Sequence, residues 1–489
     1  MPTPARSGII AALLAMLCTG CAVYRPAPLS AAQNAQTIQA RSLNDPRLRT
    51  FVAAARAGEP SHPDGSVDGG ADDSAAVDAV GNWDLATLTL AALYFHPDLD
   101  LARADVAEAR AGIRTARQVP NPSLSFEDLS YTPGAPPGTA WTIAPVVNFM
   151  IETFGKREKR TAEATALVQA ARGELRSASW RVRAGVRDAL IDLWAAQRRL
   201  DLLQARLDAE GQLVTFLERG LAAGETSGLE LARERSDSNR INLAARDAER
   251  AAVAARSQLA AAIGIPLQAL DGVRLSFDAF EKPAQPESAV ADSDLRQAAL
   301  TQRSDVQSLL ADYSAAEAAL ALEVANQYPN LTLSPGYEWD AGRHRYMLLP
   351  AVDLPLFNQN QGPIAQARAR REQAAARFTA LQTQIIDTLD GAAALYRAAN
   401  QTLATADSLL NGEQDRERQT LRMFKAGEID RATLLSTQLE RIAAEESKLD
   451  VTVQQRQALA AVEDALQHPF FGSPWPADAE SNPRTAAIF

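Results

Sequence analysis

Few side chains in this sequence are suited to metal ligation or catalysis. The 489 residues include four histidines (His62, His96, His344 and His468), which are widely separated. No Cys-x-x-Cys, His-x-x-x-His or methionine cluster is present, so no metal site is predicted. No glycine-rich phosphate loop occurs, and nothing nominates a Ser-His-Asp triad. We therefore expect no cofactor and no enzymatic activity, with a secreted hydrolase as a distant alternative.

Cys21 is the residue with the clearest chemistry. The apolar run Gly8–Cys18 follows Arg6 and precedes Thr19-Gly20-Cys21. It is too short for a membrane helix and is typical of a secretory signal peptide; a buried helix is the alternative. The segment resembles a bacterial lipoprotein signal, although Cys18 stands where leucine is usual. We expect cleavage before Cys21 and lipidation (palmitate) of its thiol, which would anchor the chain without spanning the membrane.

Composition excludes several classes of protein. The formal net charge of −11 argues against nucleic-acid partners, which require basic surfaces. With 46% hydrophobic and 22% charged residues, the chain is not disordered. Only 6% of residues are aromatic, and alanine is abundant, which favours long, closely packed helices.

The sequence contains one unit twice. Asp98 and Asp305 lie 207 residues apart, as do Pro122 and Pro329. Ala223-Gly224-Glu225 recurs 203 residues later as Ala426-Gly427-Glu428. The slowly drifting offset indicates an ancient duplication with small insertions and deletions. We predict a signal peptide (1–20), an anchor segment and linker (21–82), a first repeat (83–266), a linker (267–291), a second repeat (292–469) and a tail (470–489).

Each repeat is expected to run helix, strand, strand, very long helix, turn, helix. The predicted helices are 84–118, 156–221 and 228–263 in the first repeat, and 292–327, 363–425 and 431–467 in the second. Val186, Leu193, Leu200 and Leu207 recur every seven residues, which is typical of coiled coils. A helix of some 65 residues is roughly 100 Å long.

Four segments change to a two-residue period. The predicted strands are 123–131, 141–151, 331–340 and 346–356, with a bulge near Asp128. They are expected to pair as two hairpins through turns at 133–138 and 341–345. Ten-residue alternating strands fit a membrane β-barrel, whereas two soluble hairpins packed on the helices are the alternative. Because four strands cannot close a barrel, the protein must then oligomerise; two copies give eight strands and three give twelve.

Several motifs together resemble the TolC-like outer-membrane efflux family over residues 83–469. They are the Pro-Asn strand starts, Leu354-Pro355-Leu356-Phe357-Asn358 followed by Asn360-Gln361-Gly362, and the Ala-Gly turns followed by Leu434-Leu435-Ser436-Thr437-Gln438. The resemblance implies a mainly α fold with membrane β. It implies a homotrimer with a 12-stranded outer-membrane barrel on a periplasmic tunnel of twelve helices. It also implies a periplasmic adaptor and an inner-membrane RND-type pump as partners.

Two segments resemble the CzcC-like heavy-metal subgroup of that family. They are Glu152-Thr153-Phe154-Gly155-Lys156-Arg157 and Ser42–Leu48. The resemblance implies heavy-metal cations as cargo, and places Gly155, Lys156 and Arg157 where the barrel meets the helices. A basic helix start is unusual, because helix N-termini favour acidic residues; a solvated helix start is the alternative.

The two glycine turns are the expected working parts. They are predicted to contact the adaptor and to form a gate through Ala223, Gly224, Glu225, Ala426, Gly427, Glu428, Asp430 and Arg431. Glycine permits the tight reversal, and ion pairs among the charged residues would hold the tips closed. Solvated turn charges are the alternative. Two rival functions remain: the same channel for drugs or type I protein secretion, and a periplasmic coiled-coil scaffold without transport.

Overall fold

The computed structural model describes residues 23–57, 82–136, 138–281 and 293–471. The predicted signal peptide, Cys21 and His62 lie outside these residues, as do parts of the two predicted linkers (58–81 and 282–291) and nearly all of the tail. The chain divides into two compact units, Met1–Arg41 and Ser42–Phe489. In the first, helix α2 (Ala31–Gln39) begins at Ser30, whose hydroxyl accepts a hydrogen bond from the Gln33 amide.

The second unit consists mainly of helices and one sheet. Its first-repeat helices are α5 (Leu85–Phe95), α6 (Pro97–Arg117), α7 (Lys156–Ala223) and α8 (Gly228–Ile263), preceded by α3 (Pro46–Ala57). The second repeat supplies α11 (Ser293–Thr301), α12 (Ser304–Ala325), α13 (Gln361–Ala426) and α14 (Arg431–Leu466). The 3-10 helix η1 (Leu267–Leu270) and the short α9 (Asp278–Glu281) lie between the repeats. None of the described helices is long and apolar enough to cross a membrane.

The first helix of each repeat is broken, which corrects the continuous helices predicted at 84–118 and 292–327. His96 has an extended backbone (φ −69°, ψ 127°) because the ring of Pro97 excludes the helical conformation from the residue before it. Arg303 is extended in the second repeat (φ −55°, ψ 145°). Each break separates a short helix from a longer one that runs beside α7.

The four strands form one antiparallel sheet in the order β1 (Ser123–Tyr131), β2 (Trp141–Ile151), β3 (Leu331–Asp340) and β4 (Arg343–Val352). The two predicted hairpins are present, and they are joined through β2 and β3 across the repeats. The predicted bulge appears as a register shift between Phe126 and Asp128. The fourth strand begins earlier than predicted, because Ala341 and Gly342 make a two-residue turn with positive φ (46° and 86°).

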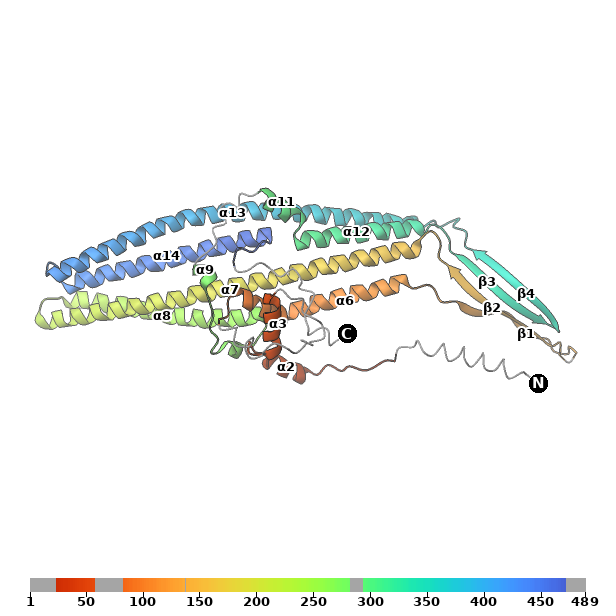
Figure 1. The fold of residues 1–489 in the computed structure, drawn as a ribbon, viewed down its shortest axis with the longest axis horizontal. Helices are drawn as coiled ribbons and strands as arrows, with labels where there is room; N and C mark the ends of the chain where they lie inside the picture. The colour runs from red at the N-terminus through yellow and green to blue at the C-terminus, as the bar shows by residue number, and fades with distance from the viewer. Residues whose placement is uncertain (1–22, 58–81, 137, 282–292, 472–489) are drawn as a thin grey trace. The chain divides into compact units, whose positions relative to one another are not determined.

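The long helices place the sheet and the turns far apart. Figure 1 shows β1–β4 at one end of the helices, with the α7–α8 and α13–α14 turns at the other. The main core joins both repeats and includes α3, whose Leu48 and Val52 are fully buried. Helices α7 and α12 approach closely at Gly173, where a Cβ would lie 2.7 Å from the Ser308 Cβ. Smaller apolar clusters continue along α7 and α8 towards the turns.

Candidate functional site

Most of the large apolar residues of the four strands share one face of the sheet. The strand register places Leu124 opposite Val147, Ile143 opposite Trp339, and Tyr337 opposite Tyr346. Side chains two residues apart on a strand point the same way, so the following residues share this apolar face: Leu124, Phe126, Leu129, Tyr131, Trp141, Ile143, Val147, Phe149, Ile151, Leu331, Leu333, Tyr337, Trp339, Tyr346, Leu348 and Val352. Many of these side chains are exposed, including Leu348 (62%) and Tyr346 (84%). A soluble hairpin would cover such a face.

The opposite face of the sheet is polar and hydrogen-bonded. Asn148 donates to the Ser125 hydroxyl (2.9 Å) and accepts from the Ser334 hydroxyl (2.7 Å), which links β1, β2 and β3. The Thr142 hydroxyl donates to Asp340 (3.0 Å). The sheet therefore has the two-sided character that separates an apolar medium from a polar interior.

Both outer strands leave one edge open within the chain. In the described residues, β1 pairs with β2 alone, and β4 pairs with β3 alone. Unpaired strand edges expose backbone donors and acceptors, which invites pairing with another strand. The edge residues of β1 and β4 are therefore the places where a second copy would add its own strands.

The basic start of α7 holds the ends of two other helices. The Lys156 ammonium is buried and donates to the Tyr328 carbonyl and the Asn330 side chain, both at 2.7 Å, just beyond α12. Burial lowers the pKa of Lys156, an effect that the charge of Glu152 opposes. Arg160 donates to the Ala116 carbonyl (3.0 Å) at the end of α6. Cations interact favourably with helix C-termini, which explains the unusual basic run.

Glu152 completes this junction. It pairs with Arg160 at 2.7 Å, and this hydrogen bond lowers the pKa of Glu152. Phe154 and Gly155 both have positive φ (58° and 67°), and the Phe154 ring stacks on Tyr328 with centroids 3.9 Å apart. Arg157 lines an open groove beside α6 and α12. The predicted junction residues thus lie where strand passes to helix, and Lys156 and Glu152 are more than solvated charges.

The two glycine turns have the same geometry. Gly224 and Gly427 have φ values of 76° and 77° and end α7 and α13. The amide of the following glutamate bonds back to the helix in each case: Glu225 to the Gly220 carbonyl (2.8 Å) and Glu428 to the Met423 carbonyl (3.0 Å). This is the closure expected of a helix C-terminus with a left-handed glycine. Ala223 and Ala426 are the last residues of their helices.

The charged turn residues do not pair with one another inside this chain, as far as the structure describes it. Asp430 caps α14 by accepting from the Thr433 amide (2.8 Å) and hydroxyl (2.6 Å), which lowers the pKa of Asp430. Arg431 donates to Gln212 on α7 (3.1 Å). Leu435 packs with Leu213 and Leu217, so the two hairpins contact each other near the turns. Ion pairing among Glu225, Glu428, Asp430 and Arg431 in the closed tips stays a prediction.

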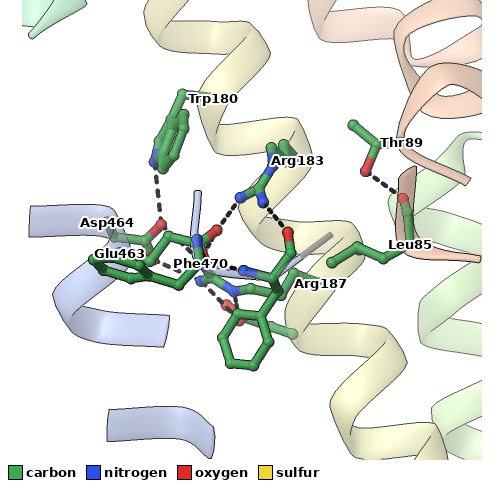
Figure 2. Close-up of polar contacts among 10 residues, drawn as sticks. Leu85, Thr89, Trp180, Arg183, Arg187, Glu463, Asp464 and Phe470 are labelled. Carbon is green, nitrogen blue, oxygen red and sulfur yellow. Dashed lines mark hydrogen bonds and ion pairs between the residues drawn. The ribbon is translucent and has the colours of Figure 1, made fainter. Parts of the chain in front are cut away.

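Sequence reasoning missed a buried charge cluster between the repeats (Figure 2). Arg183 and Arg187 lie on α7, while Glu463 and Asp464 lie on α14; Arg187 and Glu463 are fully buried. Glu463 pairs with both arginines, and Arg187 donates to Asp464 at 3.0 and 2.7 Å. Burial lowers the pKa of Arg187, but the neighbouring carboxylates of Asp464, Asp188 and Glu463 together raise it above its ordinary value.

This cluster also fixes the segment that follows α14. Arg183 donates to the Phe471 carbonyl (2.7 Å), and Glu463 accepts from the Phe470 amide (2.9 Å). Phe471 is buried against Phe280, with ring centroids 5.5 Å apart. The spacing of Arg183 and Arg187 on an apolar helix face was the available signal, but their partners lie about 280 residues away.

The histidines do not converge. His96 accepts from the Asp98 amide (3.3 Å), His344 lies on β4 beside Tyr337, and the His468 ring contacts Phe470. In the described ranges, no three His, Cys, Asp or Glu side chains are grouped to hold a metal ion.

Comparison with known proteins agrees with this architecture. Residues 89–265 match the model of a family described as outer membrane efflux protein. The cobalt-zinc-cadmium resistance protein CzcC of Cupriavidus metallidurans is 26% identical, and the match covers 76% of this chain and 86% of CzcC. The pyoverdine export outer membrane protein OpmQ of Pseudomonas aeruginosa is 24% identical over 68% of this chain and 70% of OpmQ.

Solved structures give the same result for the fold. One of these is a structure of CusC, whose description refers to transmembrane channel formation. It superposes on this chain with a TM-score of 0.61 at 18% identity, and the match covers 83% of this chain and 96% of CusC. The prediction made from the repeated strand and turn motifs is therefore confirmed: the chain is similar in sequence and in fold to the TolC-like outer membrane efflux proteins.

Proposed function

We propose that this chain is one subunit of an outer-membrane exit duct that exports heavy-metal cations. The observation that carries the proposal is the strand register, which puts most of the large apolar residues of the four strands on one exposed face and the hydrogen-bonded polar residues on the other. A face of that kind suits lipid on one side and a water-filled passage on the other. The duct performs no chemical reaction; it supplies a route.

The proposed assembly is a homotrimer. Open strand edges are not tolerated in lipid, and four strands are too few for a closed barrel. Three copies joined from β1 to β4 would give twelve strands. The helices, about 100 Å long, would then form the wall of a periplasmic tunnel, with the chain also anchored to the outer membrane through a lipid on Cys21.

The proposed partners are a periplasmic adaptor at the Gly224 and Gly427 turns and an inner-membrane RND-type pump. CzcC, a cobalt-zinc-cadmium resistance protein, supports metal cations as cargo. OpmQ, a pyoverdine exporter, keeps export of an organic molecule through the same fold as the alternative. A scaffold without transport is disfavoured, because it has no use for an exposed apolar sheet face.

Two neighbouring leucines on β4 test the proposed orientation of the sheet. Leu348 belongs to the apolar face, whereas Leu349 lies on the polar face opposite Ser334. Arginine on a lipid face costs about 2–4 kcal/mol near the bilayer midplane, and far less on a wet interior. We expect Leu348→Arg to reduce insertion into outer-membrane fractions severalfold, while Leu349→Arg inserts normally. Equal insertion of the two variants would contradict the assignment of faces.

A further inference from the structure

A groove of about 660 Å³ lies between α7, α13 and α14, and Phe280 and Glu281 of α9 also line it. Its apolar wall includes Trp194, Leu202 and Leu449, and its charged lining includes Arg456. Volumes of 300–1,000 Å³ with apolar walls are typical of small-molecule sites. The groove is remote from the sheet and from the two glycine turns, and the proposed function assigns it no role.

Arg456 is buried at this groove without an acidic partner. Its side chain is 5% exposed. The Nε atom donates to the Phe280 carbonyl (2.9 Å), and Nη1 donates to the Gln455 amide oxygen. Among the described residues, no carboxylate lies within ion-pair distance of Arg456. The hydrogen bonds of its guanidinium to these residues come from Nε and Nη1, and none comes from Nη2.

An uncompensated buried charge is costly. Burial accordingly lowers the pKa of Arg456, and the nearby Tyr396 side chain opposes this effect without cancelling it. An anion placed on the free side of the guanidinium would supply the missing charge, and two parallel N–H donors favour a carboxylate.

The other charged residues of the groove are already satisfied or exposed. Glu281 pairs with Arg198 (2.6 Å), and Asp407 pairs with Lys448 (2.7 Å). Glu445 pairs with Arg441 (2.6 Å). Asp201, the remaining acidic residue of the groove lining, is exposed to water. The acidic groups around the mouth disfavour multiply charged anions, so a single negative charge fits best.

We propose that this groove binds an amphipathic monoanion: a carboxylate joined to an aromatic or alkyl body. The carboxylate would take the free side of the Arg456 guanidinium. The apolar body would lie against Trp194, Leu202 and Leu449. The proposal does not depend on which cargo the duct carries.

Binding of 1-naphthoate to the purified full-length protein, in its native assembly in a neutral maltoside detergent, tests this. Isothermal titration calorimetry compares it with 1-naphthalenemethanol, which has the same rings and no charge. We expect saturable naphthoate binding at least tenfold tighter than that of the alcohol. Arg456→Gln should reduce naphthoate affinity to that of the alcohol.

Two further variants separate binding from folding. Leu403→Trp narrows the groove while keeping the Arg456 side chain and should abolish binding, whereas Arg235→Gln, which removes an exposed arginine outside the groove lining, should retain it. The proposal is overturned if the two probes bind equally, if no saturable binding occurs, or if Arg456→Gln keeps the preference for the acid. It is also overturned if Leu403→Trp leaves naphthoate binding unchanged.

Discussion

At the scale of the residue, Glu463 carries a buried charge that stabilises the fold. It is fully buried and serves Arg183, Arg187 and two backbone amides at once. Removing one partner of a buried pair costs about 3–5 kcal/mol, because the remaining charge is left without compensation. We expect Glu463→Gln to lower the free energy of unfolding by about 3 kcal/mol, measured by urea denaturation.

The matched control is Glu174→Gln. Glu174 pairs with Arg181 at 2.7 Å, but both side chains are more than half exposed. An exposed pair contributes about 0–1 kcal/mol. A similar loss of unfolding free energy in both variants would show that the buried Glu463 pairs stabilise the fold no more than an exposed pair does.

Glu210 makes the first hairpin sensitive to pH. It is 2% exposed on α7, and burial together with Glu234 on α8 raises the pKa of Glu210 to about 7. Because folding raises the pKa of Glu210, the protonated Glu210 side chain stabilises the fold. This stabilisation is complete below pH 4.5, the ordinary pKa of the group in the unfolded chain, and is lost as the pH rises through 7. We expect thermal stability to fall between pH 5 and 8.

Glu210→Gln should flatten this pH dependence. One pKa unit corresponds to about 1.4 kcal/mol, so the shift from 4.5 to about 7 amounts to at most about 3.5 kcal/mol. Melting temperatures across pH 5–8, with the exposed Glu218→Gln as control, measure it. An unchanged slope in the Glu210 variant would rule out this residue as the source.

At the scale of elements, both glycine turns require a residue with positive φ at the end of a long helix. Gly427 has φ of 77°, and a Cβ added there would meet open space. Any cost of substitution is therefore conformational, about 1–2 kcal/mol for a left-handed residue and more for a branched one. We expect Gly427→Val to distort the turn and impair metal resistance of cells while trimers persist.

Gly412→Val is the control for that experiment. Gly412 also has open space around its Cβ, but it lies inside α13 without positive φ. Resistance should therefore be close to normal in this variant. Normal resistance in the Gly427 variant would instead remove the turn from the contact with the adaptor.

Local patterns in the sequence predicted the elements well. The alternation at Trp141–Ile151 matches the bounds of β2, and Gly224 marks the end of α7, because both signals act within a few residues. Pro97 carried the signal for the break at His96, which the predicted continuous helix overlooked. Pairing between β2 and β3 was not predicted, since alternation alone does not choose a partner strand.

The candidate site was predictable only in part. Gly224, Gly427 and the basic run at Lys156 were visible as local motifs. The contact of Lys156 with Tyr328 and the pairing of Arg183 with Glu463 join residues 172 and 280 positions apart. Arg456 gave no sequence signal at all, because a missing partner is a property of the packed structure.

At the scale of the whole molecule, the account rests on assembly. One chain offers a sheet with an apolar face, which suits lipid, and two open edges, which lipid does not tolerate. Three chains would close the edges of β1 and β4 into one barrel and bring three copies of each turn together. Threefold repetition would also place the Glu225 and Glu428 carboxylates of different copies near the same axis.

Single-channel conductance of the purified protein in planar bilayers, combined with the mass of the assembly, tests the central claim most directly. The account predicts stable trimers that produce discrete conductance steps. A water-soluble monomer or dimer without conductance would contradict it, and the exposed apolar face of the sheet would then require a different partner.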